Sequence, residues 1–217
     1  MKRKLITLLT LSSLILSISA CGETKVESQK SVSVTEKSDT AASSDTDPGT
    51  TTEDDSKTGT VTHGEGFTKT PVITDKALNY TGNAGPMNYS IDAIQISNLV
   101  ATTDAAANMF NIEKNKETAI IALDISAENT SDEDITFFIS QATLVSNTKE
   151  QVDPSLIFSD YIDSEFLGAV KKSGSSIYIL PNSNANDITN ITLRISAPTG
   201  KDFQALSEDI TIDLSFE

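Results

Sequence analysis

Apolar and polar positions alternate with a period of two along most of the chain from residue 87 onward. Ile121, Leu123 and Ile125 are separated by less apolar neighbours, as in a strand that buries one face. Similar alternation marks four further segments: 135–145, 176–180, 191–195 and 210–216. Regularly spaced strands without long helical patterns predict a mainly β fold, an antiparallel β-sandwich of two packed sheets.

Departures from this alternation predict irregularities and turns. The apolar parity changes between Ile91 and Ile94, which indicates a β-bulge or a strand that is apolar on both faces. Residues 163–172 are expected to form a short helix or turn, and residues 104–118 a mobile hairpin loop or a single helical turn. Phe137 and Phe138 should place one ring on each face of a strand. Further turns are expected at Asp153-Pro154, Ser173-Gly174, Pro181-Asn182 and Pro198-Thr199-Gly200.

The first twenty residues have the pattern of an export signal. Lys2-Arg3-Lys4 precedes an uncharged run from Leu5 to Ala20. As a helix, this run would span about 24 Å at ~1.5 Å per residue, short of the roughly 30 Å hydrocarbon core, so a permanent transmembrane helix is disfavoured. We therefore expect residues 1–20 to be a signal peptide that is removed.

The end of this signal resembles the lipobox of bacterial lipoproteins. Ile18-Ser19-Ala20-Cys21-Gly22 has an aliphatic residue, two small residues and then the cysteine of that motif. The resemblance implies lipidation of the Cys21 thiol, cleavage before it and a membrane tether. The alternative is an ordinary secretory signal whose cleavage site happens to precede a cysteine. On the first interpretation Cys21 is a lipid attachment site and not a nucleophile.

A long polar segment follows Cys21. Of the 45 residues from Gly22 to Gly66, 17 are Ser or Thr, and ten acids oppose four lysines. Such a composition buries too little apolar surface to offset the entropy of ordering the chain, so residues 21–66 are expected to be a lipidated Cys and a disordered linker. All Phe and Tyr residues lie from Phe67 onward, which predicts a β-sandwich domain over residues 67–217 with its core from about residue 87.

Composition excludes several function classes. The chain has one Cys, one His and a net charge of −15 over 217 residues. One Cys rules out an intrachain disulfide framework and a thiolate zinc cluster, and the acidic surface disfavours a nucleic-acid partner because it repels phosphates. The sequence assigns no catalytic residue, no metal ligand and no cofactor.

Two acidic clusters are candidate cation sites. Asp132-Glu133-Asp134 lies at an expected turn, and the second cluster contains Asp160, Asp163 and Glu165. Neither has the ligand spacing of a calcium loop, so solvated loops are the simpler interpretation. His63 has no companion ligand and is expected in the linker. The fragments Lys57-Thr58-Gly59 and Ser146-Asn147-Thr148-Lys149 match pieces of a penicillin-binding signature, but in the wrong order.

Several short motifs resemble a known domain type. The strand that begins at Ala119 ends in Glu128-Asn129-Thr130, and Leu180-Pro181 leads into the strand Ile188–Ile195 and then Ala197-Pro198. This arrangement is similar to the telokin-like, immunoglobulin-type domain of unknown function common in Gram-positive lipoproteins, over roughly residues 87–217. The chain departs from it at Asn182, where a Gly is usual, and at Asn147-Thr148-Lys149, where an Asp-Gly hairpin is usual. The resemblance implies an immunoglobulin-like antiparallel β-sandwich that acts as a non-catalytic extracellular module.

These patterns together predict a lipid-anchored protein at the extracellular face of the cell membrane. Its partners would be the membrane, through the N-terminal lipid, and an unidentified protein or cell-wall component bound by the sandwich. The alternative is an extracytoplasmic hydrolase or metal-dependent enzyme. An enzyme would need convergent carboxylates in a concave cleft, which only a structure can test.

Overall fold

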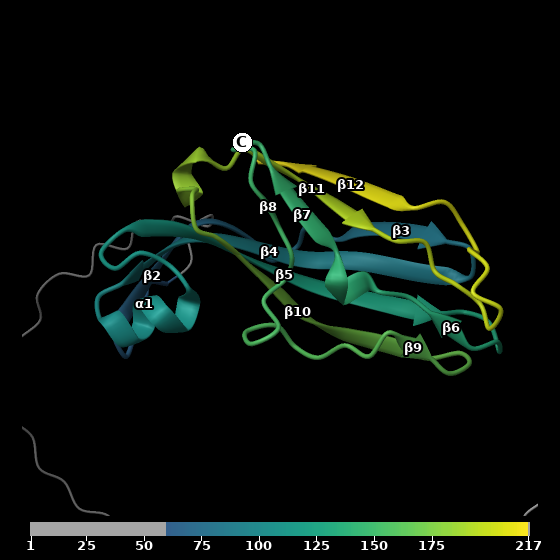
Figure 1. The fold of residues 1–217 in the computed structure, drawn as a ribbon. Helices are drawn as coiled ribbons and strands as arrows, with labels where there is room; N and C mark the ends of the chain where they lie inside the picture. The colour runs from purple at the N-terminus through teal and green to yellow at the C-terminus, as the bar shows by residue number, and fades with distance from the viewer. Residues whose placement is uncertain (1–59, 217) are drawn as a thin grey trace, which may run out of the picture. The chain divides into compact units, whose positions relative to one another are not determined.

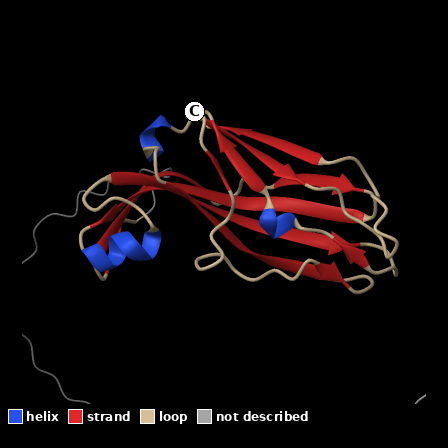
Figure 2. Cartoon of the chain, in the orientation of Figure 1, coloured by secondary structure: helices blue, strands red, loops and turns tan. Residues whose placement is uncertain are grey.

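The computed structural model describes residues 60–216, so the expected signal peptide, Cys21 and most of the expected linker lie outside the described residues. The described chain is built mainly from strands (Figures 1 and 2). The strands are β1 (Thr62–Gly64), β2 (Phe67–Asp75), β3 (Tyr80–Ala84), β4 (Met87–Ala101), β5 (Glu117–Asn129), β6 (Ile135–Thr136), β7 (Thr143–Ser146), β8 (Gln151–Val152), β9 (Glu165–Phe166), β10 (Lys171–Leu180), β11 (Asn190–Ile195) and β12 (Ile210–Ser215). The helices are α1 (Asp104–Phe110) and the 3-10 turns η1 (Ile139–Gln141) and η2 (Ala185–Asp187). β1, with His63, lies within the last residues of the stretch expected as linker.

The strands form two main antiparallel sheets. The large sheet has the order β1-β2-β4-β5-β10, with β3 also paired to β4, and the small sheet has the order β12-β11-β7-β8. In Figure 1 the small sheet lies over the large one, and the short pair β6-β9 lies beside them. The prediction of a mainly β antiparallel sandwich is therefore confirmed.

The bulge predicted from the parity change is present in β4. The register between β4 and β5 shifts between Ile91 and Ala93, so that Ile91 and Ile94 are both buried although their parities differ. On its other side β4 pairs first with β3 and then with β2, which therefore lie one after the other along it. β4 and β5 are central strands with both backbone edges paired.

The core lies between the two sheets. Alternate residues of β5, including Ile121, Leu123 and Ile125, are buried in one cluster with side chains of the small sheet, such as Leu193 and Ile212. Aliphatic side chains dominate this cluster, so burial of apolar surface is its main stabilising contribution. We call this face of the large sheet the inner face and the opposite one the outer face.

Tyr178 brings a polar group into this core. Its side chain is buried, and its phenol donates a hydrogen bond of 3.0 Å to the Ala142 carbonyl. Burial raises the pKa of the phenol well above its usual value, and the Asp153 carboxylate adds to the effect. The hydroxyl therefore remains a neutral donor that ties β10 to the segment before β7.

Residues 104–118 are more regular than expected, since they contain the two-turn helix α1. The Thr103 hydroxyl accepts a hydrogen bond from the Ala106 amide at 3.2 Å and caps its start, and Asn111 ends it in the left-handed conformation. Phe110 is buried and contacts Phe67 edge to face, with 5.1 Å between ring centroids. Within the described residues no helix is long and apolar enough to span a bilayer.

The expectation of a helix or turn over residues 163–172 was wrong in part. Phe166 is buried in β9 opposite Ile135, whereas Leu167 is exposed, so the apolar residues do not share one helical face. The segment turns at Gly168, whose φ of 69° favours glycine.

Two other local predictions also need correction. Ser173-Gly174 is not a turn but lies within β10, where a Cβ on Gly174 would approach the Cβ of Asp160 to 2.9 Å. The glycine is needed because another segment packs closely against the strand. The segment 135–145 is not one strand, because η1 interrupts it. Phe137 and Phe138 therefore lie between β6 and η1 and not in the expected strand, although one ring is buried, that of Phe137, and the other, that of Phe138, is exposed.

Thr118 in β5 is buried, and its hydroxyl has no hydrogen-bond partner among the described residues. Burying an unpaired hydroxyl costs free energy, which a methyl group of similar size avoids.

We therefore expect Thr118→Val to raise the free energy of unfolding by about 1 kcal/mol, measured by urea denaturation. The matched control is Thr192→Val, because the Thr192 hydroxyl donates a 2.6 Å hydrogen bond to Asp213 that valine cannot make. The control should not be stabilised. Equal losses of stability in the two variants would contradict the prediction.

Candidate functional site

The outer face of the large sheet carries a hollow. Its volume is about 520 Å³. The polar hollow, as we name it, is lined by residues of β3, β4, β5 and β10: Thr81, Gly82, Asn83, Asn88, Tyr89, Ser90, Ser126, Glu128 and Lys171. Most of these side chains are polar and none is a cysteine or histidine.

Strand register arranges these side chains in two parallel rows. Asn83 pairs with Asn88, Asn88 with Glu128, and Glu128 with Lys171, which gives one row across four strands. Thr81 pairs with Ser90, and Ser90 with Ser126, which gives a second row two residues along. At about 4.8 Å between strands, the first row is about 14 Å long.

The floor of the polar hollow is a pair of hydroxyls. The Oγ atoms of Ser90 and Ser126 lie 2.7 Å apart in a hydrogen bond, and Ser126 is buried. One hydrogen is used between them, so the pair retains one O–H donor and several lone pairs that can bind a ligand.

The Tyr89 side chain lies beneath the hollow, on the inner face of the sheet, where it pairs in register with Ala127 and lies 6.2 Å from the Phe137 ring. A Cβ on Gly82 would collide with the Tyr89 phenol ring, so the glycine makes room for the aromatic side chain. Burial and, secondly, the neighbouring Tyr80 raise the pKa of Tyr89. Tyr89 is thus uncharged near neutral pH, and the remaining charges of the lining, Glu128 and Lys171, balance.

A second surface feature is a loop with exposed apolar side chains, residues 155–161, which we call the apolar loop. Leu156, Ile157 and Tyr161 are 90%, 80% and 92% exposed. Phe203 is similarly exposed but lies in a separate turn. Three such side chains within six residues are unusual for a surface that contacts only water.

The apolar loop is held firmly although its tip is exposed. The amides of Ser155 and Asp160 donate to the β10 carbonyls of Ile177 and Ser175 at 2.7 and 2.9 Å. In return, the Ile177 amide donates to the Ser159 hydroxyl at 2.8 Å. These bonds fix the backbone of the loop along the outer edge of β10.

An aromatic contact fixes the start of the same loop. Phe158 is half-buried and stacks on Phe110 of α1, with 4.8 Å between ring centroids and 28° between ring planes. Leu156 and Ile157 are therefore exposed on an anchored loop, since the next residue, Phe158, is packed on α1.

The acidic cluster of Asp160, Asp163 and Glu165 lies next to the apolar loop. The Asp160 carboxylate accepts a 2.8 Å hydrogen bond from the Ser175 amide. The Glu165 amide and then the Lys172 ammonium, 3.3 Å from the carboxylate, hold the pKa of Asp163 below its usual value. Protein donors thus occupy both aspartates. Among the described residues, no three His, Cys, Asp or Glu side chains come together as a metal site.

The other candidate residues have simpler roles. Lys201 lies 3.7 Å from Glu133 and 3.6 Å from Asp134, so the second acidic cluster is an exposed loop with a nearby cation. Ser146, from the penicillin-binding fragment, hydrogen-bonds to Thr148 within its own turn. His63 lies in β1, 3.4 Å from the Thr68 hydroxyl, and Cys21 lies outside the described residues.

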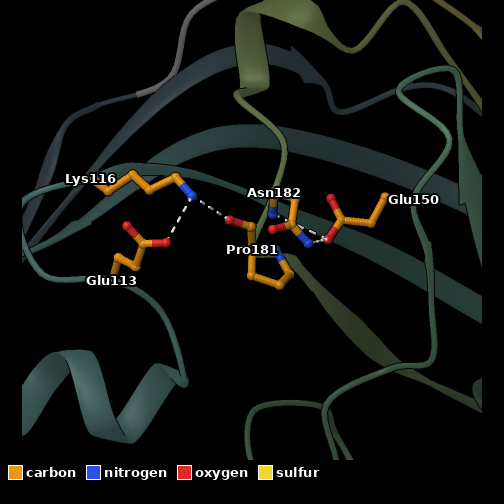
Figure 3. A network of polar contacts seen from close by, with 5 residues as sticks. All are labelled: Glu113, Lys116, Glu150, Pro181 and Asn182. Atoms are coloured by element: carbon orange, nitrogen blue, oxygen red, sulfur yellow. Dashed lines mark hydrogen bonds and ion pairs between the residues drawn. The ribbon is translucent and has the colours of Figure 1, made fainter.

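The two turns that depart from the telokin-like pattern are joined through Glu150 and Ser183, the residues that follow Lys149 and Asn182. The backbone amide and side chain of Asn182 donate to Glu150 Oε1 at 3.2 and 3.1 Å, as Figure 3 shows. The Ser183 hydroxyl donates to the other carboxylate oxygen of Glu150 and lies 2.7 Å from Thr148 Oγ1. Glu150 therefore joins the β7–β8 turn to the turn after β10.

The same turn is held from its other side. Lys116 donates to the Pro181 carbonyl at 3.3 Å and pairs with Glu113 at the same distance (Figure 3). Carboxylates and a lysine are thus used here to connect loops, and we assign this network a structural role.

Asn129, the centre of the Glu-Asn-Thr motif, is also structural. Its buried side-chain amide donates to the carbonyls of Glu133 and Gly168 at 2.7 and 2.9 Å. Its carbonyl accepts from the amide and hydroxyl of Ser131 at 2.9 and 2.8 Å. One side chain therefore joins the end of β5 to two neighbouring loops, which explains the motif without a ligand.

The chain is similar in sequence to a lipoprotein of Bacillus subtilis. It is 33% identical over 163 residues to the SPbeta prophage-derived uncharacterized lipoprotein YonS of strain 168, a match that covers 69% of this chain and 80% of YonS. No family model matches the chain.

Two solved structures are similar in fold. One is a functionally unknown protein from Listeria monocytogenes EGD-e, with 16% identity and a TM-score of 0.49, covering 68% of this chain and 86% of that chain. The other is the YjhA protein from Bacillus subtilis, with 14% identity and a TM-score of 0.44, covering 66% of this chain and 100% of that chain.

We expect Asn129→Ala to lower the free energy of unfolding by about 3 kcal/mol, because it removes four hydrogen bonds and leaves two carbonyls without their donor. The control is Asn190→Ala, which removes an exposed amide with a single 3.4 Å contact to Thr189 and should change stability by less than about 0.5 kcal/mol. Chemical denaturation measures both. Equal stabilities of the two variants would show that Asn129 is not a structural centre.

Proposed function

Since this chain belongs to the family of the SPbeta prophage-derived lipoprotein YonS, we propose that it is a lipid-anchored protein at the extracellular face of the membrane whose β-sandwich is a non-catalytic interaction module. The membrane anchor rests on the lipobox at Cys21 and on the lipoprotein description of the relative. The telokin-like assignment rests on the Glu-Asn-Thr and Leu-Pro motifs. It is part of the same proposal.

The apolar loop is the observation that carries the interaction role. Leu156 and Ile157 are almost fully exposed on a backbone fixed to β10, so binding a partner orders few further degrees of freedom. Apolar side chains that are exposed in the free protein stabilise a complex when a partner removes them from water, and Tyr161 is of a residue type enriched among those that dominate interface energy.

The charges beside the apolar loop define the kind of partner. Asp153 and Asp160 flank its tip and are exposed, and Tyr161 adds a phenol. The complementary partner is a protein with an apolar pocket bordered by Lys or Arg, because opposite charges at the rim guide association.

The surfaces described also bear on the enzyme alternative. Glu128 is the single carboxylate in the lining of the polar hollow, whereas acid–base hydrolysis uses a carboxylate pair. Asp160 and Asp163, the nearest clustered acids, accept hydrogen bonds from the protein itself. These features favour binding over catalysis.

The membrane anchor is tested by Cys21→Ser. Without a thiol the lipid cannot be attached, so the variant should move from the membrane fraction to the soluble extracellular fraction, and a tagged fatty acid should label only the wild type. Unchanged membrane partitioning of the variant would refute lipid anchoring at this residue.

The interaction role is tested by Leu156→Asp/Ile157→Asp with proximity labelling on intact cells. Both residues are exposed, so stability should change by less than about 0.5 kcal/mol while binding weakens at least about thirtyfold. The control Leu167→Asp/Phe203→Asp adds the same charges at exposed sites outside the loop. The loop variant should lose neighbours that the wild type and the control both label; identical neighbour sets would overturn the proposal.

A further inference from the structure

The polar hollow has no part in the interaction proposed for the apolar loop. Its position constrains what it could bind. It lies over β4 and β5, whose backbone groups are paired on both sides by neighbouring strands. An extended peptide recognised by strand addition needs an open edge, which here would have to be the outer side of β3 or β10, so a ligand that lies over β4 and β5 has no backbone partner. Recognition here must use side chains.

The side chains of the polar hollow offer hydrogen bonds in both directions with no net charge. Asn83 and Asn88 each present a carboxamide with two donors and an acceptor, and the Ser90–Ser126 pair presents hydroxyls. Glu128 and Lys171 add one acceptor and one donor group of opposite charge. A strongly anionic ligand would meet the Glu128 carboxylate, and a strongly cationic one the Lys171 ammonium.

The lining also disfavours lipids and aromatic ligands. Pockets for apolar ligands are lined mainly by hydrophobic and aromatic side chains, and here Tyr89 is the single aromatic member and is buried. The volume of about 520 Å³ is within the usual range of ligand pockets. These exclusions leave elongated ligands without net charge that carry many hydroxyl or amide groups. Such a ligand could lie along the row of side chains that crosses the four strands.

We propose that the polar hollow binds an uncharged oligosaccharide, with the Asn83–Asn88–Glu128–Lys171 row and the Ser90–Ser126 pair bonding to its hydroxyl groups. The strands fix the backbone that carries the short Asn, Ser and Thr side chains, and these have few rotatable bonds, so little conformational entropy is lost on binding. Without an exposed ring to stack on a sugar, the affinity of one site is modest, with a Kd of about 1 mM. Many tethered copies facing a repeating polysaccharide would raise the effective affinity.

The test is titration of the full-length chain, solubilised in a polyoxyethylene detergent that carries no sugar, with two tetrasaccharides observed by NMR. One is the β-1,4-linked tetramer of N-acetylglucosamine and the other is maltotetraose. We expect saturable binding of at least one, and preference for the first would indicate that the Asn carboxamides recognise acetamido groups. Binding should change little between about 50 mM and 500 mM salt, because the ligand is neutral.

The matched variants separate this site from the rest of the molecule. Asn88→Ala/Lys171→Ala, at two exposed positions of the lining, should weaken binding about tenfold or more. Asn190→Ala/Lys201→Ala, which changes the same residue types elsewhere, should bind like the wild type. Leu156→Asp/Ile157→Asp should also bind normally, so failure of the loop proposal and failure of this one are distinguishable.

Three results would overturn the saccharide assignment. The first is no binding of either tetrasaccharide at about 10 mM. The second is equal binding by the wild type and Asn88→Ala/Lys171→Ala when both have the same thermal unfolding midpoint. The third is binding of an acetylated tetra-alanine peptide at the hollow with neither sugar bound, which would reassign the site to peptides.

Discussion

The pairing of β4 and β5 with each other and with strands on both outer sides is the constraint on which the rest of this structure depends. The backbone groups of these strands form hydrogen bonds within the sheet, so only their side chains can form a core or bind a ligand. One face is used for the core against the small sheet. The opposite face must be either covered or polar. Helix α1, whose Phe110 stacks on Phe158, covers one part of it, and Asn88, Ser90 and Ser126 make another part polar. Both candidate surfaces follow from this division.

The sequence was informative where burial is periodic. Ile121, Leu123 and Ile125 identified β5, and the parity change after Ile91 identified the bulge, because a two-residue repeat has no other simple cause. It was misleading at Ser173-Gly174, where the glycine serves a close approach from the distant residue Asp160 and not a turn. Helix α1 was underestimated because its stability depends on Phe67 and Phe158, which are remote in sequence.

The polar hollow could not be predicted from the sequence. Asn83 and Lys171 lie 88 positions apart in the sequence, and the register of three strand pairs aligns them with Asn88 and Glu128. No local motif records such an alignment. The apolar loop did carry a signal, the run Leu156-Ile157-Phe158, but composition alone cannot say which of three apolar residues packs inward. The contact of Asn182 with Glu150 likewise required the fold, although both turns had already been recognised as departures from the resembled pattern.

Gly174 has an effect beyond its own strand. By lacking a side chain it lets residues 155–160 run along β10, the last strand of the large sheet, and take up the amide and carbonyl groups that an edge strand would leave open. Open edges allow sheets of neighbouring molecules to join, a danger that increases when proteins are crowded together on a surface. A single missing methyl group thus protects the molecule from polymerisation along this border.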